Sequence, residues 1–152
     1  MKDQILLPEV GYYKANLHCH TTLSDGEFTP ERIKAAYQEQ GYSIVAFTDH
    51  RRYENHTQLN DESFLALAAL EADLTEEPAP GRDWPVRKCY HLNLLDTDPS
   101  LHAAEKQASP LPARAYGDLE GLNRYIQEMN GLGFLVCYNH PYWSLQDWRD
   151  YS

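Results

Sequence analysis

The chain contains 152 residues, of which 42% are hydrophobic, 24% are charged and 12% are aromatic. This length and composition suit a single folded domain over residues 1–152 and exclude a wholly disordered chain. Acidic residues number 23 against 13 lysines and arginines, and the formal charge of −10 disfavours binding to long nucleic acids or anionic lipid.

Neither a membrane anchor nor a disulfide scaffold is expected. The longest apolar run, 64–70, is far shorter than the ~20 residues of a membrane span, and the N-terminus lacks the hydrophobic region of a signal peptide. Cys19, Cys89 and Cys137 form no C-x-x-C pair and are odd in number, which suits a reducing compartment. We therefore expect a cytoplasmic protein with buried thiols.

A strand is predicted over residues 13–20, at the end of which Leu17-His18-Cys19-His20 occurs. Because side chains alternate along a strand, His18 and His20 should share one face. The turn residues Ser24-Asp25-Gly26 follow. These predict that the strand is followed by a sharp change of chain direction.

A helix and a second strand are predicted next. Thr29 and Pro30 suit the N-cap and first position of a helix that runs through Gln40. The nearly continuous apolar run 42–47 is typical of a strand covered on both faces, and it ends directly in Thr48-Asp49-His50.

The middle of the chain is predicted to hold two further strands. Alanines and leucines over 64–74 favour helix, but the position between apparent strands favours a strand near 70–74, which contains Glu71. The proline-rich segment 76–87 is expected to be an exposed excursion. Residues 88–95 alternate, and they place Cys89, His91, Asn93 and Leu95 on one face.

The last third predicts a loop, a helix and a strand. Residues 96–117 are expected to be loop, and Asp118 suits the N-cap of a helix over 119–130. A fifth strand is predicted over 134–138, followed by Asn139-His140-Pro141. Strands that alternate with helical or polar segments indicate an α/β fold.

Each predicted strand carries histidine or carboxylate at or near its C-terminal end, namely His18, His20, His50, Glu71, His91 and His140. In parallel α/β folds these ends form one rim where sites assemble. Imidazole and carboxylate together suit divalent zinc, manganese or iron, and a glutamate between two ions can bridge them. The distribution therefore predicts a metal centre.

Simpler explanations exist for each residue alone. The His18 and His20 side chains could be ordinary hydrogen-bonded residues, and Glu71 could lie on the solvated side of a helix. Asp25 could belong to an ordinary turn, and a core thiol is the simpler account of Cys89. His56 and His102 lie in polar segments and are expected to be solvated.

The motif residues resemble a known family. The elements L-H-C-H-T-T-L-S-D-G from Leu17, A-F-T-D-H ending at His50, Glu71, His91 and His140-Pro141 are similar in order and spacing to the polymerase and histidinol phosphatase (PHP) superfamily. The resemblance implies a distorted (β/α)7 TIM-like barrel, incomplete in this chain with about five strands, and up to three divalent metal ions at its mouth.

The resemblance also implies roles for individual residues. His18 and His20 would hold a first ion, and Glu71 would bridge it to a second, completed by His91 and His140. A third ion would be held by Asp25 and His50. Apart from the resemblance, we expect Asp49 to orient a histidine ligand. Members of the family usually continue to a late Asp-x-His, which does not follow His140 here, so we expect a chain truncated on its C-terminal side in which the first and third sites each lack a ligand.

The expected function is a metal-dependent phosphoesterase that hydrolyses a small phosphate mono- or diester with a metal-bound hydroxide. Catalytic roles are expected for Glu71, His50 and Asp49, and Arg51 and Arg52 could reach a substrate phosphate or lie in a solvated loop. The alternatives are an exonuclease-like hydrolase on nucleic-acid ends and a non-catalytic metal-binding fragment. An open barrel also predicts self-association.

Overall fold

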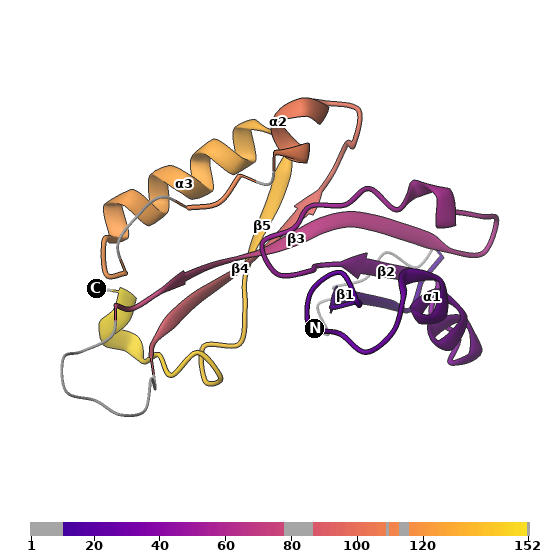
Figure 1. Cartoon of the computed structure of the whole chain (residues 1–152), viewed down its shortest axis with the longest axis horizontal. Coiled ribbons are helices and arrows are strands. Elements are labelled where there is room, and N and C mark those ends of the chain that lie inside the picture. Colours follow the sequence, from indigo (N-terminus) through magenta and orange to yellow (C-terminus); the bar gives the residue numbers. More distant parts are fainter. Residues whose placement is uncertain (1–10, 78–86, 109, 113–115, 152) are drawn as a thin grey trace, which may run out of the picture.

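The computed structural model of the chain describes residues 11–77, 87–108, 110–112 and 116–151. Five strands form one sheet in the order β1-β2-β3-β4-β5. Figure 1 shows that the sheet is strongly curled, as a half-barrel is. The strands are β1 (Ala15–Cys19), β2 (Ile44–Phe47), β3 (Leu65–Thr75), β4 (Cys89–Asp96) and β5 (Phe134–Tyr138).

The sheet is mixed, which differs from the parallel sheet expected. The strands β1, β2 and β3 are parallel, whereas β4 is antiparallel to both β3 and β5. His91 therefore lies at the start of β4, not at its end. Side chains alternate in the same way in both kinds of strand, so the alternation in 88–95 could not reveal the direction of β4.

Two helices begin where the sequence predicts. The helix α1 (Pro30–Glu39) has Thr29 as N-cap, whose hydroxyl accepts from the Arg32 amide. The helix α3 (Leu119–Gly131) has Asp118 as N-cap, whose Oδ1 accepts from the Gly121 amide at 2.8 Å. These caps satisfy amides that have no partner within the helix, and both predicted helices are confirmed.

The prediction that 96–117 is entirely loop is wrong. A short helix, α2 (Ala103–Gln107), follows His102 and buries Lys106, whose ammonium group lies 2.6 Å from Asp96 Oδ1. Five residues are too few to show helical periodicity in the sequence. Two 3₁₀ turns occupy Thr57–Leu59 and Trp148–Tyr151. The excursion predicted over 76–87 lies mostly outside the described residues.

Alternation along β3 separates an apolar face from a polar one. Ala68, Leu70, Ala72 and Leu74 belong to the core cluster that α3 covers. Glu71 and Asp73 point to the opposite face, which Ala69 shares with them. The helices α1 and α3 pack on β2 and β5 respectively (Figure 1). The helix-free face of the sheet is therefore available for a site.

The three thiols are free, and Cys19 and Cys89 are buried as expected, while Cys137 is half-buried. Among the described helices, none combines the length and the apolar character that crossing a membrane requires.

Candidate metal centre

Glu71 lies in the middle of β3 with only 1% of its surface exposed. Its backbone is fixed on both sides, because the Glu71 amide donates to the Asp49 carbonyl at 3.1 Å and the Arg51 amide donates to the Glu71 carbonyl at 2.8 Å. The chain leaving β2 therefore passes directly beside Glu71. His50 forms a bridge with it and is brought to the same place.

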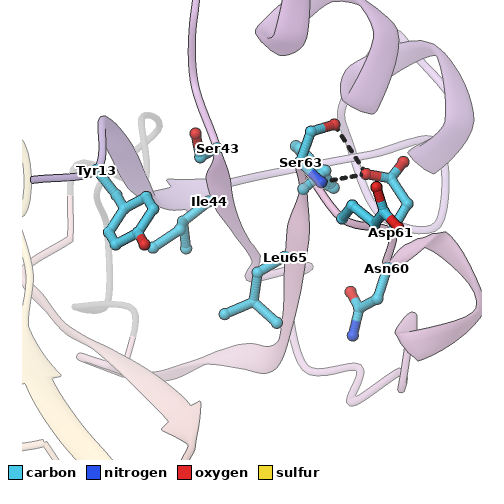
Figure 2. Close-up of a pocket in the computed structure, with 9 residues that line it drawn as sticks. Tyr13, Ser43, Ile44, Asn60, Asp61, Ser63 and Leu65 are labelled. Atoms are coloured by element: carbon cyan, nitrogen blue, oxygen red, sulfur yellow. Dashed lines mark hydrogen bonds between the residues drawn. The ribbon is translucent and has the colours of Figure 1, made fainter. Parts of the chain in front are cut away.

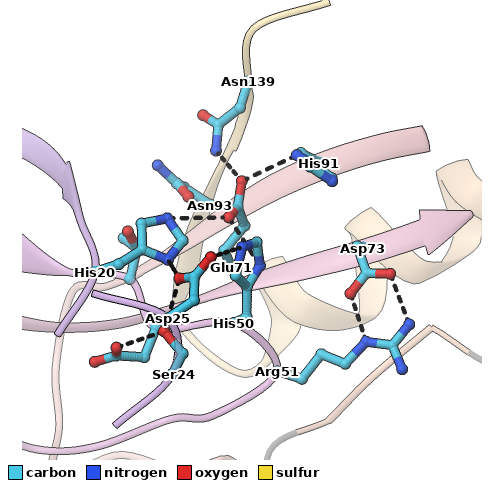
Figure 3. Close-up of polar contacts among 12 residues, drawn as sticks. His20, Ser24, Asp25, His50, Arg51, Glu71, Asp73, His91, Asn93 and Asn139 are labelled. Carbon is cyan, nitrogen blue, oxygen red and sulfur yellow. Dashed lines mark hydrogen bonds and ion pairs between the residues drawn. The ribbon is translucent and has the colours of Figure 1, made fainter. Parts of the chain in front are cut away.

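One carboxylate oxygen of Glu71, Oε1, faces three imidazoles. The nearest nitrogens lie 3.3 Å away in His140, 3.5 Å away in His91 and 3.6 Å away in His18. Asn139 also donates to Oε1 at 3.1 Å (Figure 3).

The other oxygen, Oε2, faces two imidazoles and, behind them, a second carboxylate. His50 Nδ1 lies 3.1 Å and His20 Nε2 lies 3.3 Å from Oε2. Asp25 lies 3.1 Å from His20 Nδ1 and 3.6 Å from His50 Nε2, so it closes this side of the cluster (Figure 3). All seven predicted ligand residues are thus brought together, from segments spread over more than a hundred residues.

The two edge strands of the sheet meet at this centre. His18 lies on β1 and His140 follows β5, and these strands are the first and last of the sheet order. Nevertheless the Nε2 atoms of the two histidines are 3.3 Å apart. The curl of the sheet therefore closes through side chains at the site.

The donor set fits divalent cations. Two groups of three residues could each hold a cation, because the ligand atoms inside each group all lie within 4.8 Å of one another. The groups are His18–Glu71–His140 and His20–His50–Glu71, and Glu71 belongs to both. Among the described residues, His20 Nδ1 and His91 Nδ1 are buried without a hydrogen bond of good geometry, although carboxylate oxygens of Asp25 and Glu71 lie 3.1 Å and 3.5 Å from them respectively. Buried polar atoms ordinarily have partners, so orphaned ring nitrogens beside a carboxylate are typical of metal ligands.

The grouping of atoms differs from the grouping that the family resemblance implies. The geometry pairs His18 with His140 and His20 with His50, whereas the resemblance pairs His18 with His20 and His91 with His140. Both arrangements place Glu71 between two sites. The distribution of ligands among individual ions stays a prediction.

Glu71, His18 and His91 have pKa values shifted toward the protonation states that metal ligands need, whereas the hydrogen bond to Glu71 raises the pKa of His20. Burial acts to raise the pKa of Glu71, but hydrogen bonds from His20 and Asn139 and the nearby imidazoles lower this pKa to about 2. Burial lowers the pKa of His18 and of His91, although the charge of Glu71 opposes this. Glu71 is therefore ionised, and these two imidazoles are neutral over a wider pH range than usual, as ligation requires.

Asp49 holds a turn and makes none of its hydrogen bonds to a histidine. Its Oδ1 accepts from the Thr21 amide at 2.8 Å and from the Ser24 hydroxyl at 2.7 Å, and the carboxyl group is buried. The predicted orientation of a histidine ligand by Asp49 is not found among the hydrogen bonds of its carboxylate within the described residues. Asp49 instead fixes the turn that carries Asp25.

Two residues near the centre were given no role by the sequence analysis. Thr48 Oγ1 shares a hydrogen bond of 2.7 Å with His18 Nδ1, which orients that ring. Asn139 donates to Glu71 and its own amide donates to the His91 carbonyl at 2.9 Å. Their position in the sequence could have drawn attention to them, because Thr48 belongs to the A-F-T-D-H element and Asn139 directly precedes His140.

Several other polar residues lie apart from the centre. Arg51 forms a two-point ion pair with Asp73, and Arg52 pairs with Glu54, so both guanidinium groups are engaged within the protein (Figure 3 shows the first pair). His102 is exposed as expected. The expectation for His56 is wrong, because its ring is buried against Phe47 at 4.8 Å between centroids.

A pocket of about 520 Å³ lies at the opposite ends of β2 and β3, where Ile44 and Leu65 begin the two strands (Figure 2). Ser63 donates to Asp61 in its wall. It contains none of the predicted ligands. The chemistry-bearing residues are therefore gathered at one end of these strands, and the pocket is at the other.

A crystal structure from Bacteroides vulgatus, of a two-domain protein containing a predicted PHP-like metal-dependent phosphoesterase, matches 91% of this chain and 40% of its own, with a TM-score of 0.52 and 20% identity. The chain has a PHP-type fold. The fold that the resemblance implies is thereby confirmed, and the curled sheet corresponds to part of a PHP-type barrel.

A sequence relative matches the chain over a shorter stretch. The DNA polymerase/3′-5′ exonuclease PolX of Bacillus subtilis is 43% identical over 51 residues, which are 34% of this chain and 9% of the polymerase. No protein-family model matches the chain. This PHP-type chain thus spans well under two thirds of either relative.

Proposed function

We propose that this PHP-type chain is a metal-dependent phosphoesterase acting on small phosphate mono- or diesters. The observation that carries the proposal is the position of Glu71, whose two oxygens face two separate groups of imidazoles. A carboxylate between two such groups suits a bridge between two divalent ions, and zinc, manganese and iron all accept these ligands.

The reaction requires charge neutralisation that the protein side chains alone do not provide. Divalent ions, when bound, act as Lewis acids toward phosphoryl oxygens and lower the pKa of water toward neutrality. The residues that would hold them are His18, His91 and His140 on one side of Glu71, and His20, His50 and Asp25 on the other. Asp49 holds the turn that carries Asp25, and Thr48 orients the His18 ring.

Turnover of p-nitrophenyl phosphate and bis-p-nitrophenyl phosphate with added Mn²⁺ tests the proposal. We expect activity in the wild type and a loss of at least about 100-fold in His18→Ala, because the variant removes a ligand. His102→Ala is the matched control, since His102 is exposed and lies outside the cluster.

The metal content of each protein is measured in the same samples. Equal turnover in the wild type and in His18→Ala would attribute the activity to a contaminant. If the protein is folded and loaded with metal but shows no turnover, the result would favour the alternative of a non-catalytic metal-binding fragment.

A second candidate, hydrolysis at nucleic-acid ends, is favoured by the similarity to the polymerase and exonuclease PolX. The charge of −10 opposes it, because a nucleic-acid channel is ordinarily basic. Release of nucleotides from a 3′-labelled single-stranded oligonucleotide distinguishes the two candidates. Processing of the oligonucleotide faster than the small esters would replace the first candidate by the second.

A further inference from the structure

A second cavity adjoins the metal centre. Its volume is about 350 Å³, and its wall is formed by Thr75, Arg87, Cys89, His91, Trp143 and Ser144. We call it the Arg87 pocket. His91 belongs to both places, because its Nδ1 atom lies 3.5 Å from Glu71. A group bound in the Arg87 pocket would therefore lie beside a phosphate held at the metal centre.

The charge of the Arg87 pocket is positive. Arg87 Nε is buried and has no hydrogen-bond partner among the described residues, and the described lining of the pocket includes no carboxylate. Arg51 and Arg52, by contrast, are held by Asp73 and Glu54. A buried donor without a partner is costly, and an oxyanion is the partner that a guanidinium group binds best.

The remaining walls suit the organic part of a ligand. Trp143 is 77% exposed and adds an indole surface to the pocket, while Ser144 and Thr75 add hydroxyl groups. The volume exceeds that of an isolated oxyanion several-fold, since a water molecule occupies ~30 Å³ in the liquid. The pocket therefore has room for a carbon skeleton that carries the anion.

We propose that the Arg87 pocket binds a second acidic group of the substrate, a carboxylate or a further phosphate, on the part to which the scissile phosphate is esterified. This inference rests on the proposed phosphoesterase function and narrows its substrate class to phosphate esters with two acidic groups. Arg87 provides specificity, and Trp143 covers the organic part.

The test compares 4-carboxyphenyl phosphate with phenyl phosphate, using the full chain loaded with Mn²⁺. These esters differ only by the second acidic group. In the wild type we expect KM to be about 10- to 100-fold lower for 4-carboxyphenyl phosphate, as a charge-assisted hydrogen bond allows. In Arg87→Gln the ratio of the two KM values should fall to near one, and in Arg87→Lys it should be intermediate. Arg52→Gln, whose guanidinium pairs with Glu54, is the control that should keep the wild-type ratio.

A binding measurement separates this inference from the proposed function. Calorimetric titration with 4-hydroxybenzoate, which carries the carboxylate but no phosphate, should detect binding to the wild type and not to Arg87→Gln. Phenol should bind neither protein. The Mn²⁺ affinity of Arg87→Gln should match the wild type, which shows that the variant folds.

Each outcome decides one of the two proposals. Turnover with equal KM for both esters, or 4-hydroxybenzoate binding that survives Arg87→Gln, overturns the role of the Arg87 pocket and leaves the phosphoesterase intact. Binding that depends on Arg87 in a protein without turnover supports the pocket and overturns the proposed function.

Discussion

Glu71 combines two properties that rarely coexist, nearly complete burial and a pKa lowered to about 2. An isolated buried carboxylate would have a raised pKa, so the shift measures the stabilisation of its charge by His20, Asn139 and the other imidazoles. Folding without metal therefore depends on the ionisation of Glu71 and of the histidines around it.

The pH dependence of stability follows from the directions of these shifts. Glu71 has a pKa of about 2 when folded against an ordinary 4.5, so its contribution is present above pH 4.5 and is lost as pH falls toward 2. The lowered pKa values of His18 and His91 also make the folded state less stable as the pH falls below about 6.5, because the unfolded state binds their protons more readily. His20 opposes them, because a hydrogen bond to Glu71 raises its pKa, so its contribution is present at low pH and is lost as pH rises.

The first prediction compares metal-free wild type with Glu71→Gln. The difference in unfolding free energy should shrink by on the order of 2 kcal/mol between pH 6 and pH 2.5, since only the wild type loses the charge. Urea denaturation at a series of pH values measures it. Parallel pH profiles for the two proteins would contradict the pKa assigned to Glu71.

Thr48 provides the second prediction. Thr48→Val removes the hydroxyl that lies 2.7 Å from His18 Nδ1, and we expect about 10- to 100-fold weaker Mn²⁺ binding. It also removes the partner of the Cys19 amide, at a cost of about 1–3 kcal/mol in stability. Thr48→Ser retains the hydroxyl and should keep both properties near wild type. Equal metal affinity in Thr48→Val and Thr48→Ser would exclude an orienting role.

The sequence predicted the residues that gather around Glu71, but it did not predict the residues that support them. The histidines, Asp25 and Glu71 could be predicted because imidazoles and carboxylates recur at strand ends in a known motif. Thr48 and Asn139 act through short hydrogen bonds that depend on the pairing of β1 with β2 and of β4 with β5. Such contacts are set by tertiary register, which residue type alone does not encode.

At the scale of elements, the turn after β1 is packed too tightly for any side chain at Gly26. A Cβ atom there would lie 2.4 Å from the His20 carbonyl oxygen and 2.7 Å from the Thr21 nitrogen. Both are backbone atoms that cannot rotate away, so the turn itself would have to move. That turn carries Asp25, and Asp49 holds the turn through hydrogen bonds from Thr21 and Ser24.

The third prediction is that Gly26→Ala displaces Asp25 and lowers both stability and metal affinity. We expect a loss of about 1–3 kcal/mol in unfolding free energy and about tenfold or more in Mn²⁺ affinity. Gly131→Ala is the matched control, because nothing lies within 4 Å of a Cβ at the end of α3. Denaturation and metal titration of both variants measure these effects. Equal stability and equal Mn²⁺ affinity of Gly26→Ala and Gly131→Ala would contradict the role of the turn.

The elements themselves were predictable to different degrees. The helices α1 and α3 have strong caps, and β5 has the predicted bounds of residues 134 and 138. The strand β3 was the ambiguous case, because its alanine and leucine content favours helix while its burial between β2 and β4 imposes a strand. Tertiary packing decided there against local propensity.

At the scale of the whole molecule, metal binding should be linked to folding. Ions that bind only the folded state stabilise it by about 2.7 kcal/mol at a concentration 100 times the dissociation constant. The fourth prediction is that chelation lowers the melting temperature by several degrees and that added Mn²⁺ restores it. Scanning calorimetry with metal analysis checks this, and an unchanged melting curve after complete metal removal would contradict it.

The open sheet leads to the fifth prediction, which is self-association. The outer edges of β1 and β5 have no neighbouring strand in the described chain, and Leu17 on β1 and Leu135 on β5 are exposed. Unpaired edges with apolar side chains favour pairing with another copy. Light scattering should detect concentration-dependent oligomers, and a monodisperse monomer at all concentrations would contradict the prediction.

The contact between His18 and His140 has a mechanical consequence. Within the described residues the sheet ladder has no backbone hydrogen bond between β1 and β5. The contact between His18 and His140, together with the hydrogen bond from Asn93 Nδ2 to the Leu17 carbonyl, holds the two ends of the half-barrel near each other. We call the junction between β1 and β5 at His18 and His140 the seam of the half-barrel. A cation coordinated by both rings would cross-link the two strands there. Its departure should leave the middle strands protected while amide hydrogens along the seam exchange faster with deuterium, so the ion would set the shape of the molecule as well as its chemistry.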